Sequence, residues 1–251
     1  MVKNYLVSNL FKLGNTKWAW TDRKNEGDIY QAYRRMYEIS LASYKHFLEG
    51  DWEHILWEGE VEHSCRIAQA NWPLQRDLWK NETCNIIYHG PDTLMIKPTQ
   101  IYDVFDGFEL FNHTDPRSLT YPNPYNWNLP NYLNDDFRYM SHKMDPELWD
   151  FGDKLAETWN VENNELGWNY GQVLHNLMYW RQNRTPEETI RPYVFYQAWM
   201  INHDPASIDY ANAWNGCSID DAHVLHLAGS RGAYARVEWM ESLAKQVGIP
   251  I

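Results

Sequence analysis

Cysteine is scarce in this chain of 251 residues, which contains only Cys65, Cys84 and Cys217. They form neither a disulfide framework nor a CxxC pair, and an odd count is typical of a reducing compartment. Long apolar runs are also missing: no stretch reaches the roughly 20 apolar residues that a membrane span requires, and the first residues hold too short a run for a signal peptide. We therefore expect a cytoplasmic protein without a membrane span.

Basic residues are few, with 22 Lys and Arg against 34 Asp and Glu and a net charge of -12. Such a surface does not attract a phosphate backbone by charge alone, so nucleic acid is not an expected partner. The length suits one domain, residues 1–251. Aromatic residues are abundant at 16%, and they could stack on bases or sugar rings or pack at the edge of a core. Those in loop-like segments are Trp18, Trp20, Trp127 and Trp214.

The N-terminal half predicts strands that alternate with helices. Residues 4–11 alternate and carry β-formers, which predicts a first strand. Apolar positions at helical spacing then predict a helix between Asp28, which is placed to cap it, and Gly50, which is placed to end it. A short strand at 53–59 and a helix end at 75–82 lead into a buried strand, Cys84 to Tyr88. This order is typical of an α/β fold.

Breakers dominate the stretch from Asn112 to Asp136, where four Pro and six Asn predict a long loop that could select an acceptor. Asp145 is placed to cap the helix that follows, with Pro146 at its first position. The remaining predicted elements are a helix at 170–178, a strand at 193–201, a strand running into a glycine turn at 222–233, and a final helix ended by Gly248.

Two side chains that can bind metal ions are expected at the edge of the sheet. In open α/β sheets, ligands bind beyond the carboxyl ends of the strands; Asp92 follows the strand in "NIIYHGP", and His226 lies in "VLHLAGSRG". A carboxylate and an imidazole suit Mn²⁺ or Mg²⁺ bridging two phosphates. In the segment after His226, glycine amides could approach a phosphate and a guanidinium could neutralise it. That segment is Gly229, Ser230, Arg231 and Gly232.

Each of these residues also has a structural interpretation. Asp92 next to Pro91 is turn chemistry in its own right, and His226 in an apolar strand could be a buried, hydrogen-bonded residue. We expect His223, three positions earlier, to be structural. A glycine-rich turn before a helix occurs in many folds. The alternating acids Glu58, Glu60 and Glu62 are expected to form a solvated face.

Two motifs resemble a known group of enzymes. "NIIYHGPDTLMIKP", followed by "DVFDGFELFN", resembles the segment of GT-A glycosyltransferases in which a buried strand ends in a DxD motif and resumes with Thr-Leu. "VLHLAGSRG" resembles the late HxxGxxK-type motif of the family 8, glycogenin-like, retaining enzymes. Between them, "FRYMSHKMDPELWDFGDKL" is similar to a strand and helix of such enzymes, and "WNYGQVLHNLMYW" is similar to their helix with an acid-Gln pair. The resemblance covers most of the chain, and its two end motifs are specific.

The resemblance implies a GT-A-like, or Rossmann-like, α/β fold: a mixed, mainly parallel sheet flanked by helices. It implies transfer of a sugar, with retention, from a nucleotide-diphosphate sugar, most simply a UDP-sugar, to a glycan, protein or small-molecule acceptor. Asp92 and His226 would bind Mn²⁺ or Mg²⁺. Arg231 with Gly229, Ser230 and Gly232 would hold the diphosphate, and Gln172 would face the transferred sugar.

The sequence departs from the family pattern at three places. Gly90 stands where the first Asp of DxD belongs, and we consider His89 as a substitute nitrogen ligand and donor contact. Gly232 stands where the family has Lys, with Arg231 one place early. Gly171 precedes Gln172 where an acid is usual.

These departures leave two rival functions. A non-catalytic carbohydrate-binding or structural protein on a GT-A scaffold would fit the lost acids and the many Trp residues. A nucleotidyltransferase also pairs an α/β sheet with metal-bound carboxylates, but its glycine-rich basic loop after the first strand is poorly matched by "NLFKLGNTKWAW".

Overall fold

The computed structural model describes most of the chain, and the fold is read from these residues. They are 2–13, 29–61, 65–102, 104–110, 134–158, 170–182, 195–198, 201, 205–227 and 232–251.

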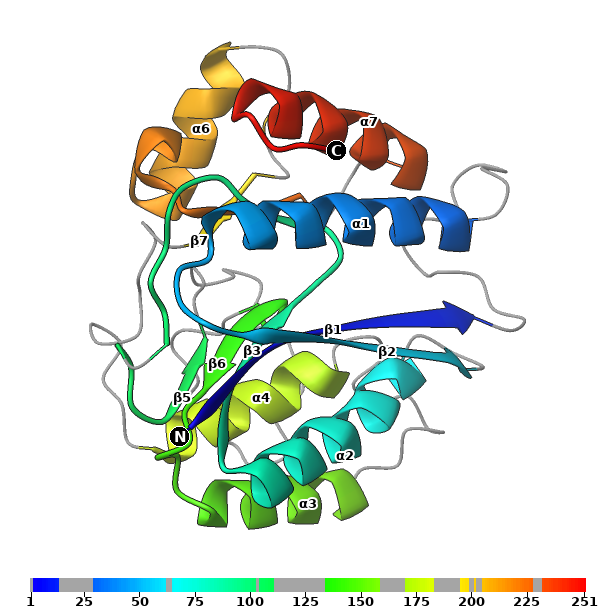
Figure 1. Cartoon of the computed structure of the whole chain (residues 1–251), viewed down its shortest axis with the longest axis vertical. Coiled ribbons are helices and arrows are strands. Elements are labelled where there is room, and N and C mark those ends of the chain that lie inside the picture. The colour runs from blue at the N-terminus through cyan, green and yellow to red at the C-terminus, as the bar shows by residue number, and fades with distance from the viewer. Residues whose placement is uncertain are drawn as a thin grey trace.

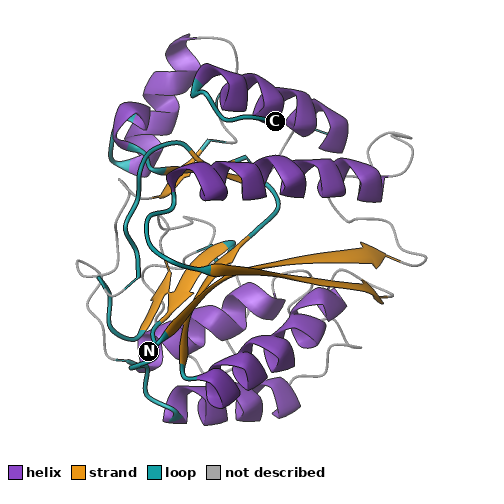
Figure 2. Cartoon of the chain, in the orientation of Figure 1, coloured by secondary structure: helices purple, strands orange, loops and turns teal. Residues whose placement is uncertain are grey.

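A central sheet of five strands lies between two layers of helices (Figure 1, Figure 2). Its order is β2-β1-β3-β6-β5; β1 is parallel to both β2 and β3, whereas β6 is antiparallel to both β3 and β5. The strands are β1 (Lys3–Leu13), β2 (Glu53–Val61), β3 (Cys84–His89), β5 (Phe108–Leu110) and β6 (Phe137–Met140). The mixed α/β fold predicted from the sequence is confirmed.

A smaller sheet of order β4-β8-β7 continues the chain path beyond β3. Strand β8 pairs antiparallel with β4 and parallel with β7. The bounds are β4 (Thr93–Met95), β7 (Phe195–Gln197) and β8 (Val224–His226). Because β4 starts four residues after β3 ends, the two sheets meet at the carboxyl end of β3.

The helices are divided between the two faces of the central sheet. Figure 1 shows α1 and α7 on one side and α2, α3 and α4 on the other, with α6 beside α7. Their bounds are α1 (Ile29–Phe47), α2 (Cys65–Glu82), α3 (Glu147–Thr158), α4 (Tyr170–Arg181), α6 (Pro205–Asn215) and α7 (Ala233–Gln246). None of the helices in the described ranges is long and apolar enough to cross a membrane.

The alternation of side chains along the strands builds a core on each face. In β3, Ile86 packs with residues of α2, α3 and α4, whereas Ile87 packs with Tyr44 of α1. Every residue of β3 is buried because helices cover both faces. A second cluster on the α1 side joins α1 to α7, for example Met36 to Met240. The side chains of β3 therefore contribute to two cores, one under α1 and one under α2, α3 and α4.

The predicted boundaries of α3 and α7 agree with the structure, whereas α1 ends at Phe47, three residues before Gly50. The Asp145 carboxylate accepts a hydrogen bond from the Glu147 amide at 2.9 Å, as expected of a cap before α3. Gly248 follows α7 with a φ of +79°, a conformation that favours glycine. Asp28, the predicted cap of α1, lies outside the described residues. The sequence did not predict β5, α6 or the first half of α2, which continues through Pro73.

Candidate functional site

The chain turns sharply where β3 ends. The Thr93 amide donates to the carbonyl of Gly90 at 3.2 Å, and the Thr93 hydroxyl donates to the same oxygen at 2.8 Å. Pro91 takes the second position of this four-residue turn, which its fixed φ favours, and Asp92 takes the third. Asp92 is therefore a turn residue, as one of the two interpretations of the sequence expected. The turn also decides where its carboxylate points.

Strand pairing brings His226 to the same place. Thr93 is the cross-strand partner of His226, and the amide of Leu227 donates to the carbonyl of Asp92 at 2.9 Å. The segment of the early motif and the segment of the late motif are thus hydrogen-bonded neighbours. The two residues predicted to share a metal ion are brought together by the backbone of the small sheet.

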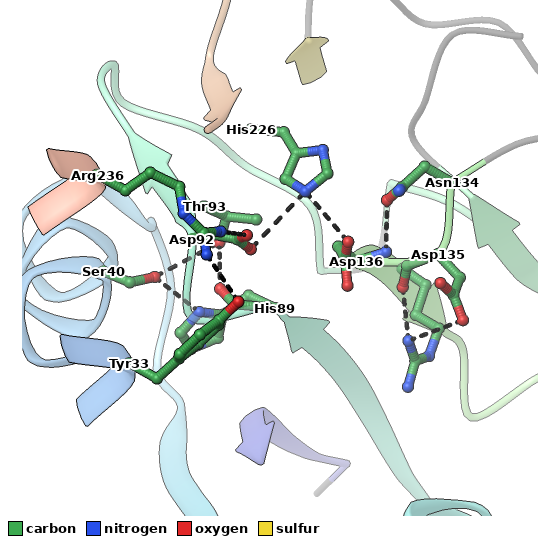
Figure 3. A network of polar contacts seen from close by, with 12 residues as sticks. Tyr33, Ser40, His89, Asp92, Thr93, Asn134, Asp135, Asp136, His226 and Arg236 are labelled. Atoms are coloured by element: carbon green, nitrogen blue, oxygen red, sulfur yellow. Dashed lines mark hydrogen bonds and ion pairs between the residues drawn. The ribbon is translucent and has the colours of Figure 1, made fainter. Parts of the chain in front are cut away.

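A third side chain, Asp136, completes a cluster with Asp92 and His226 (Figure 3). The Nε2 atom of His226 lies 3.7 Å from Oδ1 of Asp92 and 3.1 Å from Oδ2 of Asp136. The three side chains offer ligand atoms that all lie within 4.8 Å of one another. The side chain of His226 is only 2% exposed and that of Asp136 is 36% exposed, so the cluster meets solvent on the Asp136 side.

The cluster favours positive charge. Burial acts to lower the pKa of His226, but its hydrogen bond to Asp136 and the charges of Asp92 and Asp136 outweigh burial, so the pKa is raised above its ordinary value. A proton on the imidazole is one cation that these carboxylates can stabilise. A divalent metal ion is another, and it would bind the neutral imidazole and release that proton.

Arg236, near the start of α7, holds the second oxygen of Asp92. Its Nη1 lies 2.8 Å from Oδ2 of Asp92, and its Nη2 donates to the hydroxyl of Tyr33 at 2.7 Å. The side chain is 3% exposed, so this is a buried ion pair. Asp92 consequently presents Oδ1 to His226 while Oδ2 is occupied. Nothing in the sequence pattern marks Arg236, which occupies one position in an amphipathic helix.

Asp135, the residue before Asp136, is held by contacts outside the cluster. Oδ2 of Asp135 lies 2.6 Å from Nδ1 of His175 on α4, and its backbone carbonyl accepts from Nη1 of Arg138 at 2.5 Å. The Arg138 guanidinium also stacks on Tyr88 of β3, 3.6 Å from the ring centroid. Burial and the charge of Arg138 lower the pKa of His175 to about 4, so the neutral imidazole donates to Asp135. Three elements thus fix the chain entering β6.

The other predicted site residues have less defined surroundings. Gln172 is buried on α4, one turn before His175, and none of its described contacts reaches the cluster. Gly232 lies directly before α7, and its carbonyl accepts from the amide of Arg236 at 3.1 Å. Gly229, Ser230 and Arg231 lie outside the described residues, as do Trp18, Trp20 and Trp127. The diphosphate contacts of that segment therefore stay a prediction.

His89 lies apart from the cluster, although the sequence suggested it as a substitute ligand. Nδ1 of its ring is 2.9 Å from the hydroxyl of Ser40 on α1, and Nε2 is hydrogen-bonded to the hydroxyl of Ser8 on β1. Figure 3 shows the ring beside Ser40, away from Asp136. Burial lowers the pKa of His89 to about 3, so the imidazole stays neutral. With both nitrogens engaged, His89 links β1, β3 and α1.

We expect the variant His89→Ala to lose stability and to keep its metal affinity. Removing the ring takes from the hydroxyl of Ser8 its described partner and leaves that of Ser40 with the longer, 3.4 Å contact to Thr93, which should lower the free energy of unfolding by about 2–4 kcal/mol. Urea denaturation measures that loss, and calorimetry with Mn²⁺ measures the affinity. If the folded variant no longer bound Mn²⁺, His89 would have to be counted among the metal ligands.

Comparison with known proteins gives a likeness in structure alone. No family model and no curated protein matches the sequence. One solved structure with a similar fold is a glycosyltransferase involved in the glycosylation of the major capsid of PBCV-1; the TM-score is 0.52 at 14% identity, over 95% of this chain and 99% of that chain. The chain therefore has a GT-A-like glycosyltransferase fold, as the two motifs predicted, and the resemblance to family 8 stays a prediction.

Proposed function

We propose that the protein transfers a sugar from a nucleotide-diphosphate sugar to an acceptor, with a divalent cation held by Asp92 and His226. The observation that carries the proposal is the convergence of Asp92, Asp136 and His226 at the carboxyl end of β3. Ligands bind at this edge in open α/β sheets. The likeness of the whole fold to a glycosyltransferase supports the same conclusion.

The residues at this edge fit Mn²⁺ or Mg²⁺. Carboxylate oxygens are the hard ligands that both ions prefer, and Mn²⁺ also accepts an imidazole nitrogen. Asp92 and His226 would leave other coordination positions of the ion open for phosphate oxygens. When bound, the ion would neutralise the charge that develops on the departing diphosphate.

The chain's own residues would orient the donor around that ion. Arg236 holds Oδ2 of Asp92, which keeps Oδ1 turned toward His226. Arg231 and the amides of Gly229, Ser230 and Gly232 would bind the diphosphate, because glycine permits close approach and a guanidinium matches phosphate oxygens. Gln172 would face the transferred sugar. We propose a UDP-sugar as donor and retention at the anomeric carbon, with a glycan, protein or small molecule as acceptor.

Calorimetric titration with UDP-, GDP-, CMP- and TDP-sugars, each with and without Mn²⁺, tests the function. We expect one nucleotide class to bind, and to bind only weakly without the metal. Strong binding of a nucleotide sugar without Mn²⁺ would be consistent with a transferase but would overturn the proposed role of the cation. Absence of binding for every donor would overturn the transferase and favour a non-catalytic protein on the same scaffold.

A further inference from the structure

Gly90 and Asp136 lie opposite each other, directly beyond the paired ends of β3 and β6. Strands β3 and β6 are antiparallel, with His89 opposite Phe137, and the ladder continues for one more pair: the amide of Gly90 donates to the carbonyl of Asp136 at 2.7 Å. Directly opposed residues of an antiparallel pair project from the same face of the sheet. A side chain at position 90 would therefore point to where Asp136 points.

The space at position 90 is already filled by Asp136. A Cβ atom on Gly90 would lie 3.2 Å from both Cβ and Oδ1 of Asp136, and 3.3 Å from Oδ1 of Asp92. Opposed Cβ atoms are usually about 4.5–5.5 Å apart, so side chains at 90 and 136 compete for one place. Whichever residue carries a carboxylate there places it beside Asp92.

We propose that Asp136 supplies the carboxylate that the Gly-Pro-Asp motif lacks, so that the acidic pair of this cation site is divided between the turn after β3 and the residue before β6. The inference rests on the cation of the proposed function. It accounts for one of the three departures from the family pattern: Gly90 carries no side chain, and the residue opposite it carries the acid. Gly90 is then the partner that Asp136 requires, and no longer a missing ligand.

The charge of the cluster supports this role. Oδ2 of Asp92 is engaged by the Arg236 guanidinium, so Asp92 and His226 alone would offer a cation one partly neutralised carboxylate and one imidazole. Hard divalent cations bind more tightly as anionic oxygen ligands are added. Oδ2 of Asp136 lies 3.1 Å from His226, on the more exposed side of the cluster, where a donor would arrive.

The position of Asp136 is fixed by its backbone. Its carbonyl accepts from Gly90, and its amide donates to Oδ1 of Asn134 at 2.9 Å. The preceding residue, Asp135, is held by His175. A carboxylate whose backbone is held by hydrogen bonds on both sides is preorganised for binding.

Titration with Mn²⁺ alone, without any nucleotide, tests the inference. The variant Asp136→Asn keeps the shape of the side chain and removes its charge, and we expect it to bind Mn²⁺ at least tenfold more weakly than the wild type, since even indirect support of a metal site is worth about 10–100-fold. The matched control is Asp150→Asn, which removes an exposed carboxylate from α3 on the other face of the sheet and should bind as the wild type does. Equal binding by wild type and Asp136→Asn would overturn the inference.

Exchanging the two residues gives a second test. The double variant Gly90→Asp with Asp136→Gly moves the carboxylate back to position 90 and removes the opposed Cβ, so we expect it to bind Mn²⁺ more tightly than Asp136→Asn does. Gly90→Asp alone should lower the melting temperature, because two side chains then compete for one place. If the double variant folded but bound Mn²⁺ no better than Asp136→Asn, the claim that a carboxylate at position 90 can replace the one at position 136 would be wrong. If the wild type itself bound no Mn²⁺, the divalent cation in the proposed function would be wrong, independently of the role of Asp136.

Discussion

Replacing His226 by alanine is expected to abolish Mn²⁺ binding and sugar transfer while the protein stays folded. The imidazole is the least exposed side chain of the three in the cluster, and its Nε2 lies within 3.7 Å of both carboxylates. Without it, a cation would have two oxygen ligands, one on a carboxylate that already pairs with Arg236. We expect the Mn²⁺ affinity to fall at least about 100-fold, and transfer to fall by at least as much because leaving-group stabilisation is lost.

The same strand region provides the control. His223→Ala also removes an imidazole, but that ring contacts the hydroxyl of Thr99, 3.0 Å from Nδ1, and lies outside the cluster. Backbone pairing of β8 does not use either side chain, so both variants should keep the fold by circular dichroism. Retained Mn²⁺-dependent transfer in a folded His226→Ala variant would remove this histidine from the site.

Local signals in the sequence were sufficient to predict that Asp92 and His226 lie close together. Each lies at or just beyond the end of a short apolar stretch, and strand ends on one sheet edge lie close together. The two interpretations of Asp92 also proved compatible, because the turn from Gly90 to Thr93 is what presents its carboxylate. The sequence did not predict the pairing of β4 with β8, which brings the two side chains together, and their role as metal ligands stays a prediction.

The remaining partners depend on register, which local patterns do not encode. Asp136 was assigned to the end of a long loop, since nothing in "LNDDFRYM" indicates that this acid would lie opposite Gly90. Arg236 lies ten residues after His226 on a different element, and only the packing of α7 against α1 brings it to Asp92. His89 lies apart from the cluster, because its position in β3 places the ring toward α1 and Ser40.

The variant Arg236→Met is expected to cause the largest loss of stability. Methionine is flexible and apolar, so it can occupy much of the arginine's space, but it leaves the buried carboxylate of Asp92 without its guanidinium. Breaking a buried ion pair from one side costs about 3–5 kcal/mol, because one charge stays in a poorly solvated place. Tyr33 also loses the donor of a 2.7 Å hydrogen bond. Urea denaturation without metal should show this loss.

A double-mutant cycle separates the charge from the packing. Adding Asp92→Asn to Arg236→Met removes the uncompensated charge, so we expect the double variant to be more stable than Arg236→Met alone, a non-additivity expected of residues in contact. Mn²⁺ should act in the same direction, since a cation that binds only the native state stabilises it, and Asp92 freed from Arg236 should bind it more strongly. The melting temperature of Arg236→Met should therefore rise more with Mn²⁺ than that of the wild type. If Mn²⁺ raised the melting temperatures of the variant and the wild type equally, the cation would not use Asp92. If the losses in free energy of unfolding were additive, Arg236 would act through packing instead of through this carboxylate.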